Sequence, residues 1–300
     1  MIRPARFESN PHTAESNRFQ GRHHGTPAEQ QAAAAREFDA LAQTLEQAGI
    51  HVIVINDTPE PHTPDSVFPN NWISLHADSS VVLYPMEAPN RRTERRRDIL
   101  RALEEDHGFD VGRVVDLSSH EDRGHFLEGT GSLVLDRVNH VAYACLSSRT
   151  HTTVLDDFAE KLNYRVVAFD AIGRDGAAIY HTNVMMNVGE EVAVICSESI
   201  RNVAQRNEVL ESLRETGHAI VNLTYDQMEA FAGNMLELRS SHGDRIIAMS
   251  QQARDSLRPE QVEVISNSSR IVSSPIDNIE SSAGGSVRCM LAEIHLPLRA

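Results

Sequence analysis

Three things are scarce in this 300-residue chain: cysteine, long apolar runs and basic charge. The cysteines, Cys145, Cys196 and Cys289, are an odd and widely spaced set without a Cys-x-x-Cys pair, which argues against a disulfide framework and a zinc site. No apolar segment approaches the length of a membrane span, and the first six residues lack the apolar run of a signal peptide. We therefore expect a soluble, cytoplasmic protein.

The charge balance is acidic, with 28 Lys and Arg against 43 Asp and Glu and a net charge of −15. This balance argues against nucleic acid or a membrane as the main partner, because both carry negative charge themselves. The one basic cluster, residues 91–97, mixes arginines with Glu94 and flanks a helical pattern. For most of its members we expect a solvated helix face.

Short strand-like runs alternate with helical patterns along the whole chain. The strand-like runs, mostly rich in β-branched residues, are His51–Ile55, Val81–Tyr84, Ser132–Leu135, Val141–Leu146, Arg165–Phe169, Val192–Cys196, Ala219–Leu223, Arg245–Met249 and Cys289–Leu296. Helical patterns cover residues 28–48, 91–107, 151–163, 202–216, 251–257 and 276–283. A strand, strand, helix, strand unit recurs, and no low-complexity linker divides the chain. We predict one α/β domain over residues 1–300, with residues 8–26 as a polar arm or loop.

The candidate nucleophile is Cys289. It follows the glycine-bent loop Gly284-Gly285-Ser286-Val287-Arg288 and precedes an apolar run predicted to form a buried strand. A neighbouring cation and backbone donors favour the thiolate form of such a cysteine. Cys145 and Cys196 end strand-like apolar runs, and we expect both to be structural.

A cysteine nucleophile needs a proton-transfer partner, usually a histidine oriented by a carboxylate. His181 precedes Thr182-Asn183 and an apolar run, which places it at the mouth of a predicted strand. Glu128 precedes a Gly-Thr-Gly turn, where an acid could be held in a partly dry environment. The alternatives are an ordinary strand-end histidine and a solvated acid at a loop tip.

The ordered set of these motifs resembles the pentein, or guanidino-group-modifying, superfamily. The resemblance covers nearly the whole chain and is strongest to the citrulline-utilisation hydrolases. It is carried by Met1-Ile2-Arg3-Pro4-Ala5-Arg6-Phe7, Asp65-Ser66-Val67-Phe68-Pro69-Asn70-Asn71-Trp72 and the Cys289 loop. It implies a five-bladed, pseudo-symmetric α/β propeller with a central site, often as a homodimer. It also implies Cys289 as nucleophile, His181 as general acid/base and Glu128 as the acid beside it, without metal or cofactor.

The resemblance also implies residues that bind an amino-acid substrate. Arg149 lies in an element like the family's Ser-x-Arg-Thr, whose arginine binds the substrate α-carboxylate. Arg91 or Arg92 resembles a second substrate-facing arginine, and the sequence does not choose between them. Asp65, just before the Phe-Pro-Asn-Asn turn, is expected to line the pocket.

Two departures from the deiminase pattern bear on the substrate. Asn71 and Asn183 stand where deiminases have aspartates that hold a cationic guanidinium. An amide both donates and accepts hydrogen bonds, which suits a neutral ureido group with its carbonyl oxygen and NH2. We therefore expect hydrolysis of citrulline to ornithine, ammonia and carbon dioxide. Succinylarginine dihydrolases, however, resemble an Asn-containing variant and still accept a guanidino substrate.

Two alternatives to citrulline hydrolysis remain open. One is an arginine-type deiminase or amidinotransferase that acts on a guanidino substrate. The other is a non-catalytic relative that binds an amino acid or a partner protein. Against the second, the candidate nucleophile, base and acid are all present in this chain.

Overall fold

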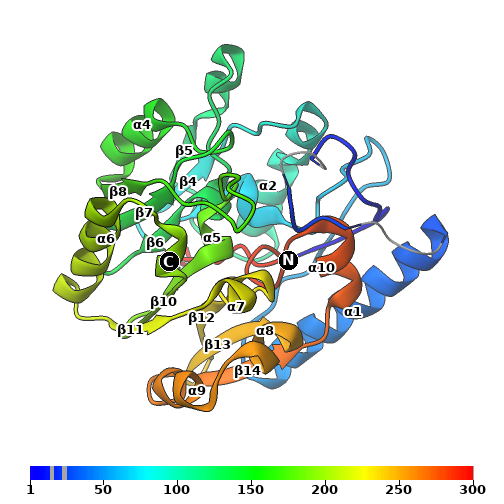
Figure 1. Ribbon diagram of the computed structural model, residues 1–300. Coiled ribbons are helices and arrows are strands. Elements are labelled where there is room, and N and C mark those ends of the chain that lie inside the picture. Colours follow the sequence, from blue (N-terminus) through cyan, green and yellow to red (C-terminus); the bar gives the residue numbers. More distant parts are fainter. Residues whose placement is uncertain (14–16, 22–25, 300) are drawn as a thin grey trace.

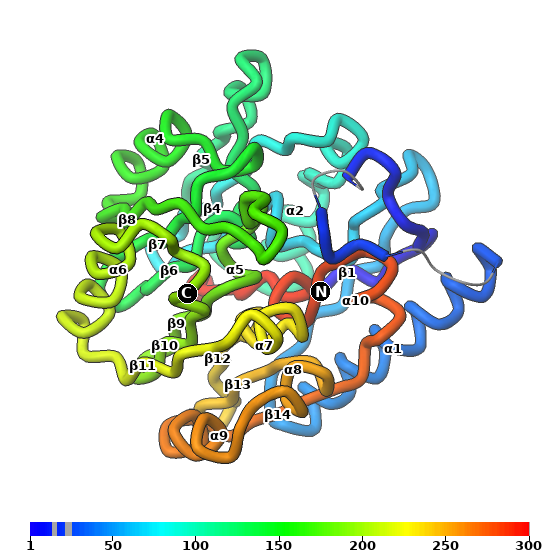
Figure 2. The backbone as a smooth tube through the Cα atoms, viewed as in Figure 1, coloured from blue at the N-terminus to red at the C-terminus, as the bar shows by residue number. Residues whose placement is uncertain are grey.

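The computed structural model describes residues 1–13, 17–21 and 26–299. The parts of the predicted arm at 14–16 and 22–25 lie outside these residues. Small sheets surround a common centre, and most helices lie on the outside (Figure 1). The last residues of the chain, red in Figure 2, run through the middle of this ring.

Four units repeat the same connectivity. They are β3 (Ile73–Leu75), β4 (Ser80–Leu83), α2 (Arg97–Glu105), β5 (Arg113–Asp116); β6 (Val134–Asp136), β7 (Val141–Cys145), α4 (Thr152–Leu162), β8 (Arg165–Phe169); β9 (Met186–Val188), β10 (Val192–Ile195), α6 (Val203–Glu215), β11 (Ala219–Asn222); and β12 (Leu236–Arg239), β13 (Arg245–Ser250), α8 (Gln251–Ser256), α9 (Pro259–Ser266), β14 (Arg270–Ser274). In each unit the first two strands pair antiparallel and the last two pair parallel. Parallel pairing requires a crossover connection, which the helices provide.

The fifth unit is formed by N-terminal residues and packs against residues 276–291, near the other end of the chain. β1 (Ile2–Arg3) and β2 (Ile55–Asn56) pair parallel and are connected by α1 (Pro27–Gln47). A capping box of Thr26 and Glu29 starts α1, and an apolar stripe of Ala34, Phe38, Leu41, Ala42 and Leu45 is buried. The five units make the fold a pseudo-symmetric α/β propeller, as the resemblance implied.

Most of the predicted strands and helices are confirmed to within one or two residues. The predicted strand Cys289–Leu296 is wrong: residues 286–291 form a turn and residues 291–297 are irregular. One backbone acceptor in this segment, the carbonyl of Leu291, is bound by the side chain of Arg288. The predicted strand His51–Ile55 keeps only Ile55, in β2. The predicted helix at 91–107 is divided into the 3-10 helix η2 (Pro89–Glu94) and α2.

The sequence patterns missed several short elements: β3, β5, β9, β12, β14, α9, α3 (Gly129–Ser132), α5 (Thr182–Met185) and α7 (Tyr225–Glu229). The missed strands are three to five residues long. A strand this short shows only one or two alternations of apolar and polar side chains, and such a pattern cannot be distinguished from that of a turn.

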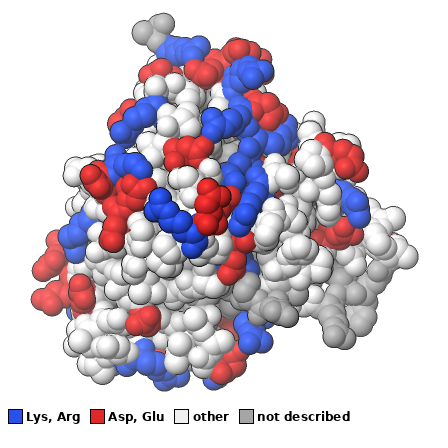
Figure 3. All heavy atoms as spheres, turned by 90° about the horizontal axis from the view of Figure 1, so that it is seen from above, with Lys and Arg blue, Asp and Glu red and all other residues white. Residues whose placement is uncertain are grey.

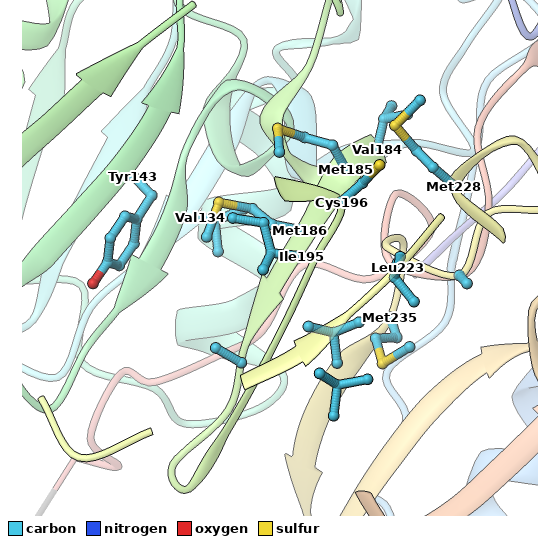
Figure 4. Close-up of a cluster of buried hydrophobic side chains, with 14 of the residues drawn as sticks. Val134, Tyr143, Val184, Met185, Met186, Ile195, Cys196, Leu223, Met228 and Met235 are labelled. Atoms are coloured by element: carbon cyan, nitrogen blue, oxygen red, sulfur yellow. The ribbon is translucent and has the colours of Figure 1, made fainter. Parts of the chain in front are cut away.

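The core between the units is apolar. Figure 4 shows part of one cluster, in which Met185, Met186 and Met228 surround Ile195 and Cys196. Methionine fills irregular gaps of the kind that arise where sheets meet at an angle. Cys145 and Cys196 are both buried, and burial raises the pKa of each thiol to about 12, which disfavours a thiolate at either position.

Charged side chains of both signs are mixed on the face seen in Figure 3. Each arginine of the basic cluster 91–97 is in an ion pair with an acid. Of these arginines only Arg97 is mostly exposed; Arg91 is buried, and Arg92, Arg95 and Arg96 are partly buried against their acidic partners. The expectation of a solvated helix face for most of the cluster was therefore wrong.

Five short segments meet at one end of the ring, and the first four each precede the first strand of a unit. They are η1 (Pro69–Asn71), α3, α5, the turn 231–234 and the turn 286–291. A Cβ on Gly131 would lie 2.6 Å from Nδ2 of Asn71 and 2.7 Å from Nδ1 of His181. Gly233 is similarly close to the backbone of α5, and Gly285 to the ring of Phe68. The glycines therefore let neighbouring segments approach closely enough to bring their side chains together.

The last of these segments follows α10 (Asp277–Ala283), whose N-terminus is held by a distant acid. Glu37 of α1 accepts hydrogen bonds from the backbone N–H groups of Asn278 (2.8 Å) and Ile279 (2.9 Å). Ile276, the residue at the N-cap of α10, supplies no side-chain cap. Glu37 therefore caps the N-terminus of α10, although it lies 241 positions away in the sequence.

We expect Glu37→Ala to lower the free energy of unfolding by about 1–2 kcal/mol, because it removes a cap and a favourable charge at a helix N-terminus. Urea denaturation measures this change. Glu46→Ala, at an exposed position near the end of the same helix, is the matched control. Equal stabilities of the two variants would contradict the capping role.

Candidate active site

The side chain of Cys289 is almost completely buried, with 4% of its surface exposed. Gly284 ends α10 with a left-handed backbone (φ +66°), which turns the chain toward the centre of the ring. The sulfur accepts hydrogen bonds from Nδ2 of Asn183 (3.4 Å) and Nδ2 of Asn234 (3.3 Å). The expected cation is not among these donors, because the guanidinium of Arg288 binds Glu293 (3.0 Å) instead. Amides therefore take the place predicted for the arginine.

His181 and Glu128 form a buried pair, with Nε2 of the imidazole 2.9 Å from Oε2 of the carboxylate. His181 is the N-cap of α5, so the prediction of a strand mouth was wrong, and the strand β9 begins only after that helix. Glu128 precedes α3 and is fully buried, which rejects the alternative of a solvated loop tip. Its other oxygen accepts the backbone N–H of Glu87 (3.0 Å).

Burial alone would raise the pKa of Glu128. Arg149 nearby, the hydrogen bond from His181 and the charge of Arg91 outweigh it and hold this pKa well below its ordinary value. The pKa of His181 is lowered to about 4. Burial is the main cause, the hydrogen bond and charge of Glu128 oppose it, and the charges of Arg149 and Arg91 add to it. At neutral pH the pair is therefore an ionised carboxylate and a neutral imidazole, which is the form that accepts a proton.

Arg149 contacts two acids. Its guanidinium lies 3.2 Å from Glu87 and 3.4 Å from Glu128, and it stacks over the ring of Tyr180 at 4.9 Å. Its exposed fraction is 2%, so a charge in this position is held by its partners and not by water.

Of the two candidate arginines at 91–92, the structure places only Arg91 at the site. Arg91 is buried, contacts Asp65 (3.2 Å) and Glu94 (2.9 Å), and donates to Oδ1 of Asn71 (3.1 Å). Arg92 instead binds the carbonyl of Met86 and pairs with Glu121. Arg92 therefore lies outside the cluster.

The two asparagines that bear on the substrate, Asn71 and Asn183, differ in whether a side-chain hydrogen-bonding atom remains without a partner. Oδ1 of Asn71 is taken by Arg91, and its Nδ2 donates to Asn70. Asn183 donates to Cys289, but its buried Oδ1 has no hydrogen-bond partner in the part of the chain that the structure describes. An unpaired buried acceptor is costly, and a bound N–H group would satisfy it.

One small cavity, of about 20 Å³, connects most of these residues. Its lining includes six predicted site residues: Asp65, Asn71, Arg91, Arg149, His181 and Cys289. Glu128 and Asn183 lie directly behind it, in contact with His181 and Cys289 respectively. The structure thus brings together every predicted site residue except Arg92.

Part of the predicted arm covers this cavity. Thr13 and Asn17 line it, and Nδ2 of Asn17 donates to the carbonyl of Ala283 (2.9 Å). Asn10 donates to Asp65 (2.8 Å). The described residues of the arm therefore close the site from the side of α10.

Sequence reasoning missed Asn234, which touches the sulfur. The only feature that could have indicated Asn234 is its position, just before the first strand of the fourth unit. Asn71, Glu128 and Asn183 lie at similar positions, in or next to the segments that precede the first strands of other units. Only a repeat that is visible in the fold shows this equivalence.

In residues 1–13, 17–21 and 26–299 the structure contains no group of three or more His, Cys, Asp or Glu side chains placed to hold a metal ion. None of the helices in the same residues combines the length and the apolar composition that a bilayer crossing requires.

The pKa of His181 predicts a pH dependence of stability. The unfolded chain binds a proton on this residue near pH 6.5 and the folded protein only near pH 4, so stability is lost as the pH falls from 6.5 toward 4. Between pH 7 and pH 5 we expect the wild type to lose about 2 kcal/mol more than His181→Gln. Urea denaturation at both pH values measures this, with His242→Gln at the surface as control. Parallel losses in the wild type and His181→Gln would contradict the assignment.

Comparison with solved structures finds the same fold. The N-terminal domain of ArgZ, an arginine dihydrolase from the ornithine-ammonia cycle in cyanobacteria, matches with a TM-score of 0.73 and 19% identity over 99% of this chain and 98% of that one. AgrE in complex with L-arginine matches at TM-score 0.70 and 18% identity, over 97% of this chain and 39% of AgrE. A dimethylarginine dimethylaminohydrolase adduct matches at TM-score 0.61 and 13% identity, over 96% of both chains.

No curated protein matches the sequence. One family model, described as "N,N dimethylarginine dimethylhydrolase, eukaryotic", matches residues 3–296. Since this match spans nearly the whole chain, and the similar structures are penteins, the protein belongs to this dimethylarginine-dimethylhydrolase family within the guanidino-group-modifying pentein superfamily.

Proposed function

We propose that the protein is a metal-independent cysteine hydrolase that cleaves citrulline to ornithine, ammonia and carbon dioxide. The observation that carries this proposal is the amide environment of Cys289: Asn183 and Asn234 contact its sulfur, and Oδ1 of Asn183 is buried without a partner. A ureido NH2 would donate to that oxygen without needing a carboxylate to balance a positive charge.

Arg149 and Asp65 would hold the amino-acid end of the substrate. We assign the α-carboxylate to Arg149, whose planar guanidinium suits a bidentate contact. Asp65 lines the same cavity and would accept from the α-ammonium group. Arg91 already contacts Asp65, Glu94 and Asn71, so its proposed role is to fix these groups in place.

The chemistry follows from the protonation states. His181, neutral at pH 7, takes the thiol proton as the sulfur of Cys289 attacks the ureido carbon, and Glu128 stabilises the imidazolium. The imidazolium then protonates the departing nitrogen, which leaves as ammonia and gives an S-carbamoyl-type thiocarbamate. His181 next removes a proton from water, which attacks this carbon and frees the thiol and a carbamate. The carbamate decomposes to ornithine and carbon dioxide.

A guanidino substrate is the second candidate. The similar structures include one named an arginine dihydrolase and one solved with L-arginine, and the carboxylate of Asp65 in the cavity could face a guanidinium. Arginine would require the same displacement of ammonia twice, with citrulline as the intermediate. Amidino transfer or a non-catalytic binding role are weaker candidates, because His181, Glu128 and Cys289 lie together here.

A single catalytic domain over 1–300, a cytoplasmic location and a homodimer stay predictions.

The direct test is product analysis. We expect ornithine and ammonia from citrulline, no citrulline from arginine, and a loss of at least about 1,000-fold in kcat for Cys289→Ser. Mass spectrometry of both reactions measures the products, and Cys196→Ala, which removes a buried thiol outside the cavity, is the matched control. Citrulline formed from arginine would favour the second candidate, and full activity of Cys289→Ser would reject covalent catalysis.

The amide argument has its own test. Asn71→Asp combined with Asn183→Asp should shift the ratio of kcat/KM from citrulline toward arginine by about tenfold or more, because each new carboxylate pairs with a guanidinium and repels a ureido carbonyl. Asn187→Asp, at a buried amide outside the cavity, controls for the general effect of a buried carboxylate. An unchanged ratio in the folded double variant would remove the substrate argument.

A further inference from the structure

Asn234 has every hydrogen-bonding group of its side chain occupied. Its Nδ2 donates to the carbonyl of Asn183 (3.0 Å) and to the sulfur of Cys289 (3.3 Å). Its Oδ1 accepts from the backbone N–H of Arg288 (3.0 Å). An amide nitrogen carries two hydrogens, so these contacts use both. Asn234 is also fully buried, which keeps water from competing for any of them.

These contacts join two segments of the ring at the nucleophile. Asn234 holds the residue before Cys289 through Oδ1 and the sulfur itself through Nδ2, and it ties both to the backbone of α5. A Cβ on the preceding residue, Gly233, would lie 2.4 Å from the carbonyl of Val184, so this approach requires glycine there. The position of the sulfur is therefore set by the turn 231–234 as well as by its own turn.

Asn183, the other donor to the sulfur, is not saturated. Its Oδ1 lacks a partner in the described part of the chain, so it keeps an acceptor for a substrate. The two amides thus differ in their remaining capacity, although both touch the same atom. Asn183 can still accept a hydrogen bond from a ligand, whereas the side chain of Asn234 binds only the sulfur and backbone groups.

We propose that Asn234 is a further catalytic residue, whose carboxamide stabilises the thiolate of Cys289 and fixes its direction, while Asn183 binds the substrate. When the thiol proton passes to His181, the negative charge on the sulfur strengthens the N–H contact from Asn234. When the carbon–sulfur bond forms, that charge leaves the sulfur and the contact weakens again. The proposal rests on the proposed role of Cys289 as nucleophile.

The test is the pH dependence of alkylation of Cys289 by iodoacetamide, which requires no substrate. Asn234→Asp keeps the shape of the side chain and the acceptor for Arg288, but it places a carboxylate against the sulfur. We expect the pH midpoint of alkylation to rise by about one unit or more. We expect kcat on the substrate to fall about 10–100-fold, with KM changed less than about twofold.

Asn187→Asp is the matched control, because Asn187 binds the carbonyl of Met235 (2.6 Å), the residue after this turn, and does not touch the sulfur. It should leave the alkylation midpoint unchanged. Thermal unfolding shows whether each variant is folded. If Asn234→Asp is not folded, Asn234→Ser replaces it, because its hydroxyl is too short to reach the sulfur of Cys289. Asn234→Ser should likewise raise the pH midpoint of alkylation.

An unchanged midpoint in a folded Asn234 variant would overturn the proposal, and so would an equal rise in Asn187→Asp. A rise confined to the Asn234 variants supports it. Because alkylation is measured without substrate, this result is independent of whether citrulline or arginine is hydrolysed. A failure of the proposed substrate is therefore distinguishable from a failure of the role of Asn234.

Discussion

The carboxylate of Glu128 is the charge on which the rest of the site depends. It is fully buried, yet it stays ionised because Arg149 and His181 bind it and Arg91 lies 3.8 Å away. Removing it would leave two buried cations without their common partner, a change that costs about 3–5 kcal/mol in other buried ion pairs. The same carboxylate orients the imidazole and stabilises it when it carries a proton. Stability and proposed catalysis therefore rest on one group.

The pseudo-symmetry explains how residues from distant parts of the chain reach this group. Five short segments meet at the same end of the ring, and between them they bring amides, an acid, a histidine and a thiol. Glycines where neighbouring segments touch remove the Cβ atoms that would hold them apart. The shared fold supplies the positions, and the individual residues supply the chemistry.

Much of this could be predicted from the sequence, because the long helices and the β-branched strands show clear periodicity. The nucleophile, the histidine, the acid and Arg149 followed from the resemblance, and their contact could only come from the fold. The choice of Arg91 over Arg92 was not available, since both follow the same turn and differ only in which one is buried. Asn234 was missed because it is equivalent to the other site positions only in three dimensions. The sequence Arg288-Cys289 suggested a helpful cation, but Glu293 binds that guanidinium elsewhere.

The proposed reaction passes through a covalent intermediate on Cys289, formed from a ureido group and held by amides. Rapid acid quenching during turnover of citrulline, followed by mass spectrometry of the peptide that contains Cys289, would detect it. We expect a thiocarbamate adduct that still carries the ornithine skeleton and the ureido carbonyl oxygen. An adduct that forms only from arginine and retains an imine nitrogen, or turnover with an unmodified Cys289, would contradict it.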